Sequence, residues 1–202
     1  MKAITVITPS IRPDGLKMTF ETLQKQTFKD FEWLPRLSIP GEQSDLSFQM
    51  NRALAESDGE IIVFLQDYIE IPENALQKII ELYRISKDAF TFPMVKGGVE
   101  DWRRTSENNK QIEFNCWEID FGCALKSDIM RVDGFCEAYD QGFGWDNVDL
   151  AYRMGLSGVK FRVHTELVAQ GIDHDSFIEH PYRKNSNQAL WEMRKKIIDD
   201  DV

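Results

Sequence analysis

Along the first half of the chain, continuous apolar runs alternate with segments in which apolar residues recur at helical spacing. Continuous apolar or β-branched runs, which are typical of buried strands, occupy Ala3–Thr8, Phe31–Leu37, Ile61–Leu65 and Ala89–Val95. Apolar residues at helical spacing fill the intervals at Leu16–Gln26, Ser47–Ser57 and Pro72 to about Ser86. This alternation predicts an α/β fold in which a mostly parallel central sheet carries helices on both faces.

The carboxyl ends of the predicted strands are where a ligand is expected. In open α/β sheets, ligands bind in the crevice outside these ends. The loops that follow Thr8, Leu37 and Leu65 are therefore the first candidates for a functional site. Ile61–Leu65 is apolar throughout, which predicts a strand in the interior of the sheet, covered on both faces.

The second half of the chain has a less regular pattern. Lys96–Lys110 is polar and predicts an irregular loop. Ser127 can cap a short helix that ends near Gly134. The remaining expected elements are one or two strands within Ile112–Leu125, helices at Asn147–Met154 and Asn187–Ile198, and short strands at Lys160–Val163 and Leu167–Ala169.

Composition and charge narrow the functional classes. A formal net charge of -10 argues against a broad nucleic-acid-binding face, because neutralising phosphates needs clustered Lys and Arg, so nucleic acid is not an expected partner. Three cysteines without a CxxC pair indicate neither a disulfide framework nor a zinc site. The apolar runs are too short for a signal peptide or a membrane span, so we expect a cytoplasmic protein.

Three segments, in this order along the chain, resemble a known group of enzymes. They are ITVITPSIRP, NRALAESDGEIIVFLQDYIEIPENAL and GFCEAYDQGFGWDNVDLAYRMGLSG. Together they resemble the family 2 glycosyltransferases and the related galactosyltransferase C-terminal domain. The resemblance implies a single Rossmann-like domain of the GT-A type over residues 1–202. Residues 1–95 would form its nucleotide-sugar-binding half, and residues 96–202 its acceptor and catalytic half.

The same resemblance implies an activity and its partners. Enzymes of this kind move a sugar from a nucleoside diphosphate sugar, here a UDP-sugar, to a hydroxyl group, and they usually use Mn²⁺ or Mg²⁺. The expected partners are the donor and a hydroxyl-bearing acceptor of the carbohydrate class. Two alternatives stay open: a nucleotide-sugar-binding module with little or no turnover, and a sugar transferase that acts on modified nucleic-acid bases.

A metal site is expected at Gln66-Asp67-Tyr68, where the family has its Asp-x-Asp motif. A divalent cation there would stabilise the charge that develops on the leaving diphosphate. In the preferred register Asp67 is the second acid of the motif and the metal ligand. In the other register Gln66 and Tyr68 replace both acids and Asp67 is the spacer. A further alternative is that Asp67 only begins a loop. His174 is the preferred second ligand, with His180 behind it.

The nucleotide is expected to lie against residues from several segments. The resemblance places Thr8, Pro9, Ser10 and Arg12 around the nucleoside, with Asn51, Arg52 and Gln66 also facing the nucleotide. Arg183 and Lys184 would close over the diphosphate, since cationic side chains pair well with phosphate. For Arg52, a charge on the helix surface is an equal alternative. For Arg183 and Lys184, the equal alternative is an exposed basic turn.

Catalysis is assigned to the segment that contains Asp146, Asn147 and Asp149. Inverting sugar transfer needs a general base for the acceptor hydroxyl. The usual base position holds Asn147, so Asp146 is the first candidate and Asp149 the second. The alternatives are a retaining mechanism, or a helix-capping role for Asp146 and a first-turn, dipole-compensating role for Asp149.

Aromatic and glycine residues of the second half are the candidates for sugar and acceptor contacts. Trp145 and Phe143 offer flat apolar faces, and Gly144 lets the backbone approach a ligand closely. Trp102, in the polar loop, is placed to reach the acceptor. For each aromatic side chain, packing in the core is the alternative.

Overall fold

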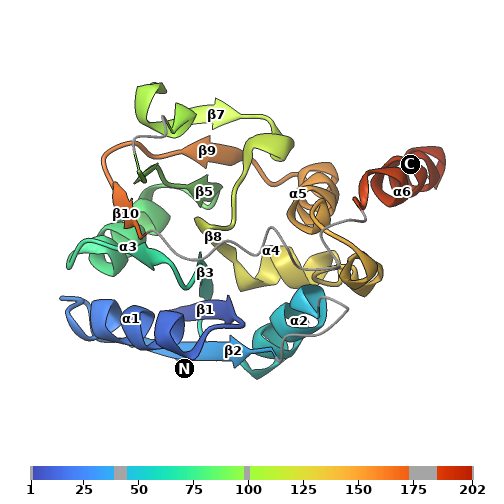
Figure 1. Ribbon diagram of the computed structural model, residues 1–202. Coiled ribbons are helices and arrows are strands. Elements are labelled where there is room, and N and C mark those ends of the chain that lie inside the picture. The colour runs from blue at the N-terminus through green and yellow to red at the C-terminus, as the bar shows by residue number, and fades with distance from the viewer. Residues whose placement is uncertain (1, 39–44, 98–100, 173–185, 202) are drawn as a thin grey trace.

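Strands from both halves of the chain join in one sheet in the computed structural model, which describes residues 2–38, 45–97, 101–172 and 186–201 (Figure 1). The strand order in this seven-stranded sheet is β2 (Phe31–Leu37), β1 (Ile4–Ser10), β3 (Ile61–Leu65), β8 (Phe121–Leu125), β5 (Ala89–Thr91), β9 (Phe161–Val163) and β7 (Lys110–Ile112). Five of these strands share one direction, and β8 and β7 run against them. The predicted α/β class with a mostly parallel sheet is therefore confirmed.

Helices cover both faces of the sheet, as the sequence predicts. α1 (Pro13–Gln24) and α3 (Ala75–Ile85) contribute Leu23 and Ile79 to one apolar cluster. α2 (Leu46–Glu56), α4 (Lys126–Arg131) and α5 (Asp146–Leu156) contribute to the other cluster. Strand β3 supplies alternate side chains to the two clusters, because successive residues of a strand point to opposite faces. All five of its residues are buried, which confirms the interior position expected for Ile61–Leu65.

Smaller elements complete the domain. α6 (Gln188–Asp201) lies on the far side of α5 from the sheet (Figure 1). A second sheet has the order β4 (Ile69–Glu70), β10 (Ala169–Gly171) and β6 (Met94–Val95). Single-turn 3₁₀ helices span Trp102–Thr105, Phe114–Cys116 and Glu137–Gln141. No helix within the described residues is long and apolar enough to cross a membrane.

Three local expectations are wrong. Ala89–Val95 is not one strand: β5 ends at Thr91 and β6 begins at Met94, since Pro93 lacks the N–H that a central ladder needs. Ser127 does not cap α4, because it lies inside that helix and Leu125 is the capping position. The stretch expected to be an irregular polar loop contains the Trp102–Thr105 turn, in which Arg103 is buried.

Candidate functional site

The carboxyl ends of β1, β3 and β5 lie at one edge of the sheet, because these strands share a direction. Strand β8 runs the opposite way, so the residue before its amino end, Asp120, reaches the same edge. The backbone N–H of Gln66 donates to the Asp120 carbonyl over 2.9 Å, which joins the end of β3 to the start of β8. The loops predicted after Thr8 and Leu65 therefore do meet at this edge.

Asp67 is held by the loop that follows β1. Arg12 donates to both carboxylate oxygens of Asp67, with 3.0 Å between its Nε and Oδ2, and Ser10 Oγ also donates to Oδ2. Gly15, in the first turn of α1, leaves room for this carboxylate, since a Cβ there would lie 2.5 Å from Oδ2. Asp67 is only 3% exposed and lies near the amino end of α1, which favours a negative charge.

Tyr68 lies beside this ion pair and is flanked by cations. The Arg12 guanidinium carbon is 6.0 Å from the centre of the Tyr68 ring, and Lys96 Nζ is 4.7 Å from it. Burial, followed by the negative charges of Asp120 and Asp67, raises the pKa of Tyr68 to about 12. The phenol therefore stays protonated at neutral pH.

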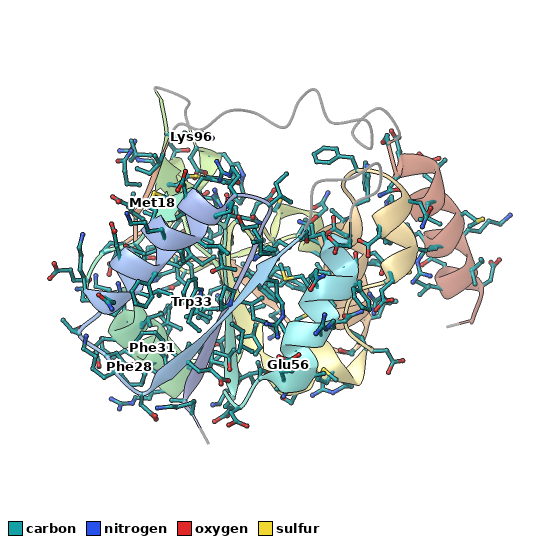
Figure 2. All side chains as sticks on the ribbon, turned by 60° about the horizontal axis from the view of Figure 1, so that its bottom comes forward. Met18, Phe28, Phe31, Trp33, Glu56 and Lys96 are labelled. Atoms are coloured by element: carbon teal, nitrogen blue, oxygen red, sulfur yellow. The ribbon has the colours of Figure 1, made fainter. Side chains whose placement is uncertain are left out.

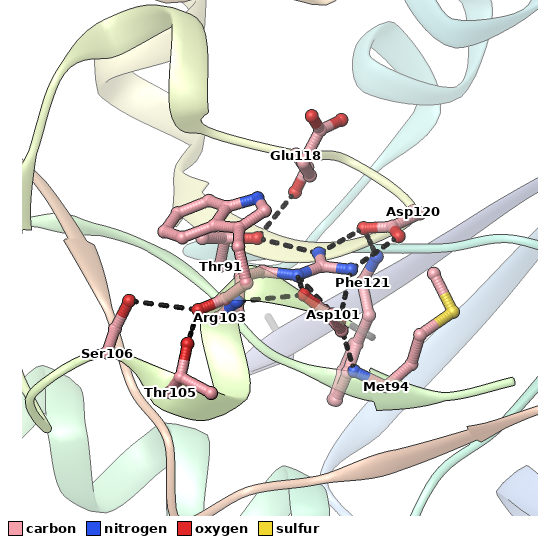
Figure 3. Close-up of polar contacts among 10 residues, drawn as sticks. Thr91, Met94, Asp101, Arg103, Thr105, Ser106, Glu118, Asp120 and Phe121 are labelled. Carbon is pink, nitrogen blue, oxygen red and sulfur yellow. Dashed lines mark hydrogen bonds and ion pairs between the residues drawn. The ribbon is translucent and has the colours of Figure 1, made fainter. Parts of the chain in front are cut away.

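A buried arginine, Arg103, lies at the same edge of the sheet and contacts Thr91 and Asp120 (Figure 3). Arg103 is 4% exposed and forms ion pairs with Asp101 and, over 2.7 Å, with Asp120. Its Nη1 also donates to Thr91 Oγ1, at the end of β5. Burial alone would lower the pKa of Arg103, but the hydrogen bonds and charges of Asp120 and Asp101 raise it above its ordinary value. The three groups fix the Trp102–Thr105 turn against the sheet.

The described residues do not fit a divalent metal site at Asp67. Mg²⁺ and Mn²⁺ need several oxygen or imidazole ligands, and a carboxylate that coordinates must present a lone pair to the ion. Here the guanidinium of Arg12 already lies on the Asp67 carboxylate. No group of three or more His, Cys, Asp or Glu suited to a metal occurs within the described ranges. The preferred second ligand, His174, lies outside them, as do His180, Arg183 and Lys184.

The other residues assigned to the nucleotide have varied surroundings. Thr8 is buried in β1 and accepts from Trp33 Nε1 over 3.1 Å, and Pro9 is buried beside it. Asn51 bridges α2 to the backbone N–H and carbonyl of Phe135. Arg52 is exposed, 3.9 Å from Glu56 on the same helix, which favours the surface-charge alternative. Their contacts to a nucleotide stay predictions.

Asp146 is the first residue of α5 and has no cationic partner among the described residues. The backbone N–H groups of Asp146 and Asn147 lower the pKa of its carboxylate, but burial outweighs them and raises this pKa to about 6, and the charges of Asp140 and Asp149 add to the rise. The residue is 8% exposed. Trp145, not Asp146, is the capping residue, and it has a φ of 73°. Such a backbone is rare for an aromatic residue and is typical of functional sites.

Asp149 lies in the same helix but is fully buried between arginines. Arg153 and Arg194 reach opposite oxygens of the carboxylate, at 2.6 and 2.8 Å, and the Tyr139 hydroxyl donates over 3.3 Å. These contacts tie α5 to α6 and favour a structural role over the predicted catalytic one.

Glu118 is a candidate that the sequence reasoning missed. Burial and the charge of Asp120 raise its pKa, and Asp146 is close enough to add to the rise. The residues next to them in the chain are hydrogen-bonded: Asn147 Nδ2 donates to the carbonyl of Trp117 over 3.2 Å. The stretch around Glu118 has no motif that would have singled it out; only the fold brings it to Asp146.

The aromatic candidates differ in exposure. Trp145 stacks on Trp191 of α6, with ring centres 6.2 Å apart and planes tilted by 15°, so one of its faces is covered. Phe143 and Trp102 are exposed. Gly144 has a φ of 76°, and a Cβ there would meet none of the described residues within 4 Å. Among the described residues, the turn before α5 therefore leaves room beside Gly144 for an acceptor contact.

Comparisons with known proteins show the fold class. No protein-family profile and no curated protein matches the sequence. Among solved structures, S. aureus TarS matches with a TM-score of 0.68 and 14% identity over 86% of this chain and 37% of TarS. TarS 1–349 in complex with UDP-GlcNAc matches with a TM-score of 0.68 and 14% identity over 90% of this chain. The complex of TarS 1–349 with UDP matches with a TM-score of 0.63 and 15% identity over 84% of this chain.

This chain spans 60% of the length of TarS 1–349, and identity is low throughout. The likeness therefore concerns the fold alone: the chain shares its fold with TarS, whose solved structures include complexes with UDP and with UDP-GlcNAc. Membership of family 2 in particular stays a prediction.

Proposed function

We propose that this chain is a glycosyltransferase that moves a sugar from a nucleoside diphosphate sugar, specifically a UDP-sugar, to a hydroxyl group of a carbohydrate acceptor. The observation that carries the proposal is the fold shared with TarS in its UDP-GlcNAc complex, over 90% of this chain. The residues at the carboxyl edge support it, since Arg12 is a cation of the kind that binds phosphate and Asp146 is a carboxylate suited to accept a proton.

In this proposal Asp146 acts as the general base of an inverting transfer. The acceptor hydroxyl gives its proton to the Asp146 carboxylate, and its oxygen attacks the anomeric carbon of the donor. The bond between that carbon and the diphosphate oxygen breaks, and the electron pair leaves with the diphosphate. A pKa of about 6 suits the task, because a base works best when its pKa lies near the working pH.

Charge on the departing diphosphate needs a positive partner. In the proposed site Arg12 supplies it. Asp67 holds the guanidinium in place, and Ser10 Oγ donates to the Asp67 carboxylate. No step above depends on Mn²⁺ or Mg²⁺, which the described residues around Asp67 do not fit. The exposed Phe143 and Trp102 are the surfaces proposed to meet the acceptor sugar.

The test is release of UDP from a panel of UDP-sugars mixed with carbohydrate acceptors, with Asp146→Asn measured in parallel. UDP release that depends on the acceptor and falls in the variant supports the proposal. Binding of a UDP-sugar without UDP release would favour the alternative of a binding module. Failure to bind any nucleotide sugar would contradict both.

A further inference from the structure

We propose that Arg12 and Lys96, both held against the Tyr68 ring, form a pair of cations that binds the donor diphosphate without a divalent metal ion. The inference rests on the proposed function and extends it to Lys96, a residue that no motif of the sequence singles out. It names the ligand chemistry, a diphosphate, and the two side chains that recognise it.

Arg12 takes the position where a metal would otherwise meet Asp67. The guanidinium donates to both oxygens of the carboxylate, and the Arg12 backbone N–H donates to Ser10 Oγ over 2.7 Å. Asp67 therefore fixes the orientation of Arg12 through Nε and Nη2. A planar guanidinium held in this way matches the oxygens of a phosphate group.

Lys96 is positioned by the second sheet. It follows β6, and its stem lies against Gly171 in β10, where an added Cβ would be 2.9 Å from the Lys96 Cβ. The backbone N–H of Ile172 donates to the Tyr68 carbonyl over 2.7 Å, which joins β10 to the Tyr68 turn. In Figure 2 Lys96 lies near the top of the view, whereas Phe28 and Phe31, at the start of β2, lie at its lower left.

The charges next to the Tyr68 ring favour an anion. Tyr68 is neutral at pH 7. Asp101 and Asp120 share Arg103, so that neighbouring group keeps one negative charge, and the positive charge lies on the side of Arg12 and Lys96. Asp67 offsets the charge of Arg12, while within the described residues no carboxylate forms an ion pair with Lys96, whose contact is the Tyr68 ring. The cluster of Arg12, Asp67 and Lys96 thus keeps one positive charge in a half-buried place, where a phosphate gains more from it than in open water.

The experiment is titration calorimetry with two probes, UDP-GlcNAc and inorganic pyrophosphate, each in EDTA and in Mn²⁺. It compares the wild-type chain with Lys96→Gln and with a matched control, Lys110→Gln, which changes an exposed lysine on β7 at the far edge of the sheet. We expect both probes to bind in EDTA. Lys96→Gln should weaken them by about tenfold or more, as expected for loss of a charge-assisted hydrogen bond, and Lys110→Gln should not.

A second variant tests the placement of Lys96 without removing its charge. Gly171→Ala should displace the Lys96 stem and weaken both probes, whereas Gly155→Ala adds a Cβ with ordinary contact, 3.6 Å from Phe161, and should leave binding unchanged. Thermal unfolding of each variant identifies any loss of fold. If Lys96→Gln and Gly171→Ala are both folded and bind both probes as tightly as the wild-type chain does, the inference is overturned.

The outcomes separate this inference from the proposed function. UDP-GlcNAc that binds only with Mn²⁺, whatever residue stands at position 96, would overturn the metal-free cation pair and leave the glycosyltransferase proposal standing. Pyrophosphate binding in EDTA that depends on Lys96, without binding of any UDP-sugar, would support the cation pair and contradict the proposed function. Absence of binding by both probes would overturn both.

Discussion

Two buried aspartates, Asp67 after β3 and Asp146 at the start of α5, have opposite electrostatic surroundings. Asp67 meets a guanidinium and a hydroxyl, so its charge is compensated. Asp146 has no cationic partner among the described residues, and burial raises its pKa to about 6. A compensated carboxylate serves as an anchor, whereas an uncompensated one can exchange a proton near neutral pH. In the proposed function, this difference places donor binding at the end of β3 and proton transfer at the start of α5.

The largest expected effect is on turnover. Asp146→Asn keeps the shape of the side chain but removes the proton acceptor, so we expect turnover to fall by roughly 10²–10⁴-fold, with donor affinity nearly unchanged. Steady-state UDP release with a defined carbohydrate acceptor measures this. Glu118→Gln is the matched comparison, because Glu118 is another carboxyl group nearby with a raised pKa. A collapse in Glu118→Gln together with normal turnover in Asp146→Asn would transfer the base role to Glu118.

Asp149 and Asp146 lie in the same helix, α5, and offer a second comparison between a paired and an unpaired aspartate. Asp149→Ala leaves Arg153 and Arg194 without their buried partner, and we expect the free energy of unfolding to fall by about 3 kcal/mol. Urea unfolding monitored by circular dichroism measures it. Asp199→Ala is the control, since its ion pair with Lys195 is exposed and such pairs contribute little. An Asp149→Ala variant as stable as wild type, with lost turnover, would restore the catalytic assignment.

The smallest expected effect is a change in the pH dependence of stability. An unfolded Asp has a pKa near 3.9, and Asp146 in the fold has one of about 6, so the folded chain binds more protons between these values. This group therefore makes the free energy of unfolding fall as pH rises from about 4 to about 6, and the loss persists above that. Asp146→Asn should be more stable than wild type at pH 7, by about 1–3 kcal/mol.

Chemical denaturation of both proteins at pH 4 and pH 7 checks this sign. The difference in stability between variant and wild type should be larger at pH 7. If Asp146→Asn is less stable than wild type at pH 7, the carboxylate is stabilised in its charged form and the contrast with Asp67 disappears.

Local patterns were sufficient for most elements but not for their order in the sheet. The apolar run Ile61–Leu65 and the helical spacing of Ser47–Ser57 predict β3 and α2 closely, because the spacing of apolar residues reflects which face of an element is buried. The antiparallel insertion of β8 between β3 and β5 was not predicted. It depends on pairing between residues about 60 positions apart, such as Ile61 with Leu125, and no local signal encodes that choice.

The candidate site was predictable in its acids but not in their partners. Asp67 and Asp146 stand in motif-like positions, whereas Arg103 and Lys96 lie in a stretch whose polarity indicates a solvated loop. Arg103 is buried because Asp101 and Asp120 pair with it, and Lys96 is placed by Gly171. Both arrangements arise from contacts between residues far apart in the sequence. The local sequence around Arg103 and Lys96 therefore does not predict them.

The most direct test of the contrast is a kinetic measurement on two isosteric variants, Asp67→Asn and Asp146→Asn, with UDP-GlcNAc or the best donor found. Asp67→Asn should raise the donor KM, because Arg12 loses its charged anchor, and should change kcat less. Asp146→Asn should lower kcat and leave the donor KM near its wild-type value. If the two variants change the same parameter by similar factors, the division between donor binding and proton transfer is wrong.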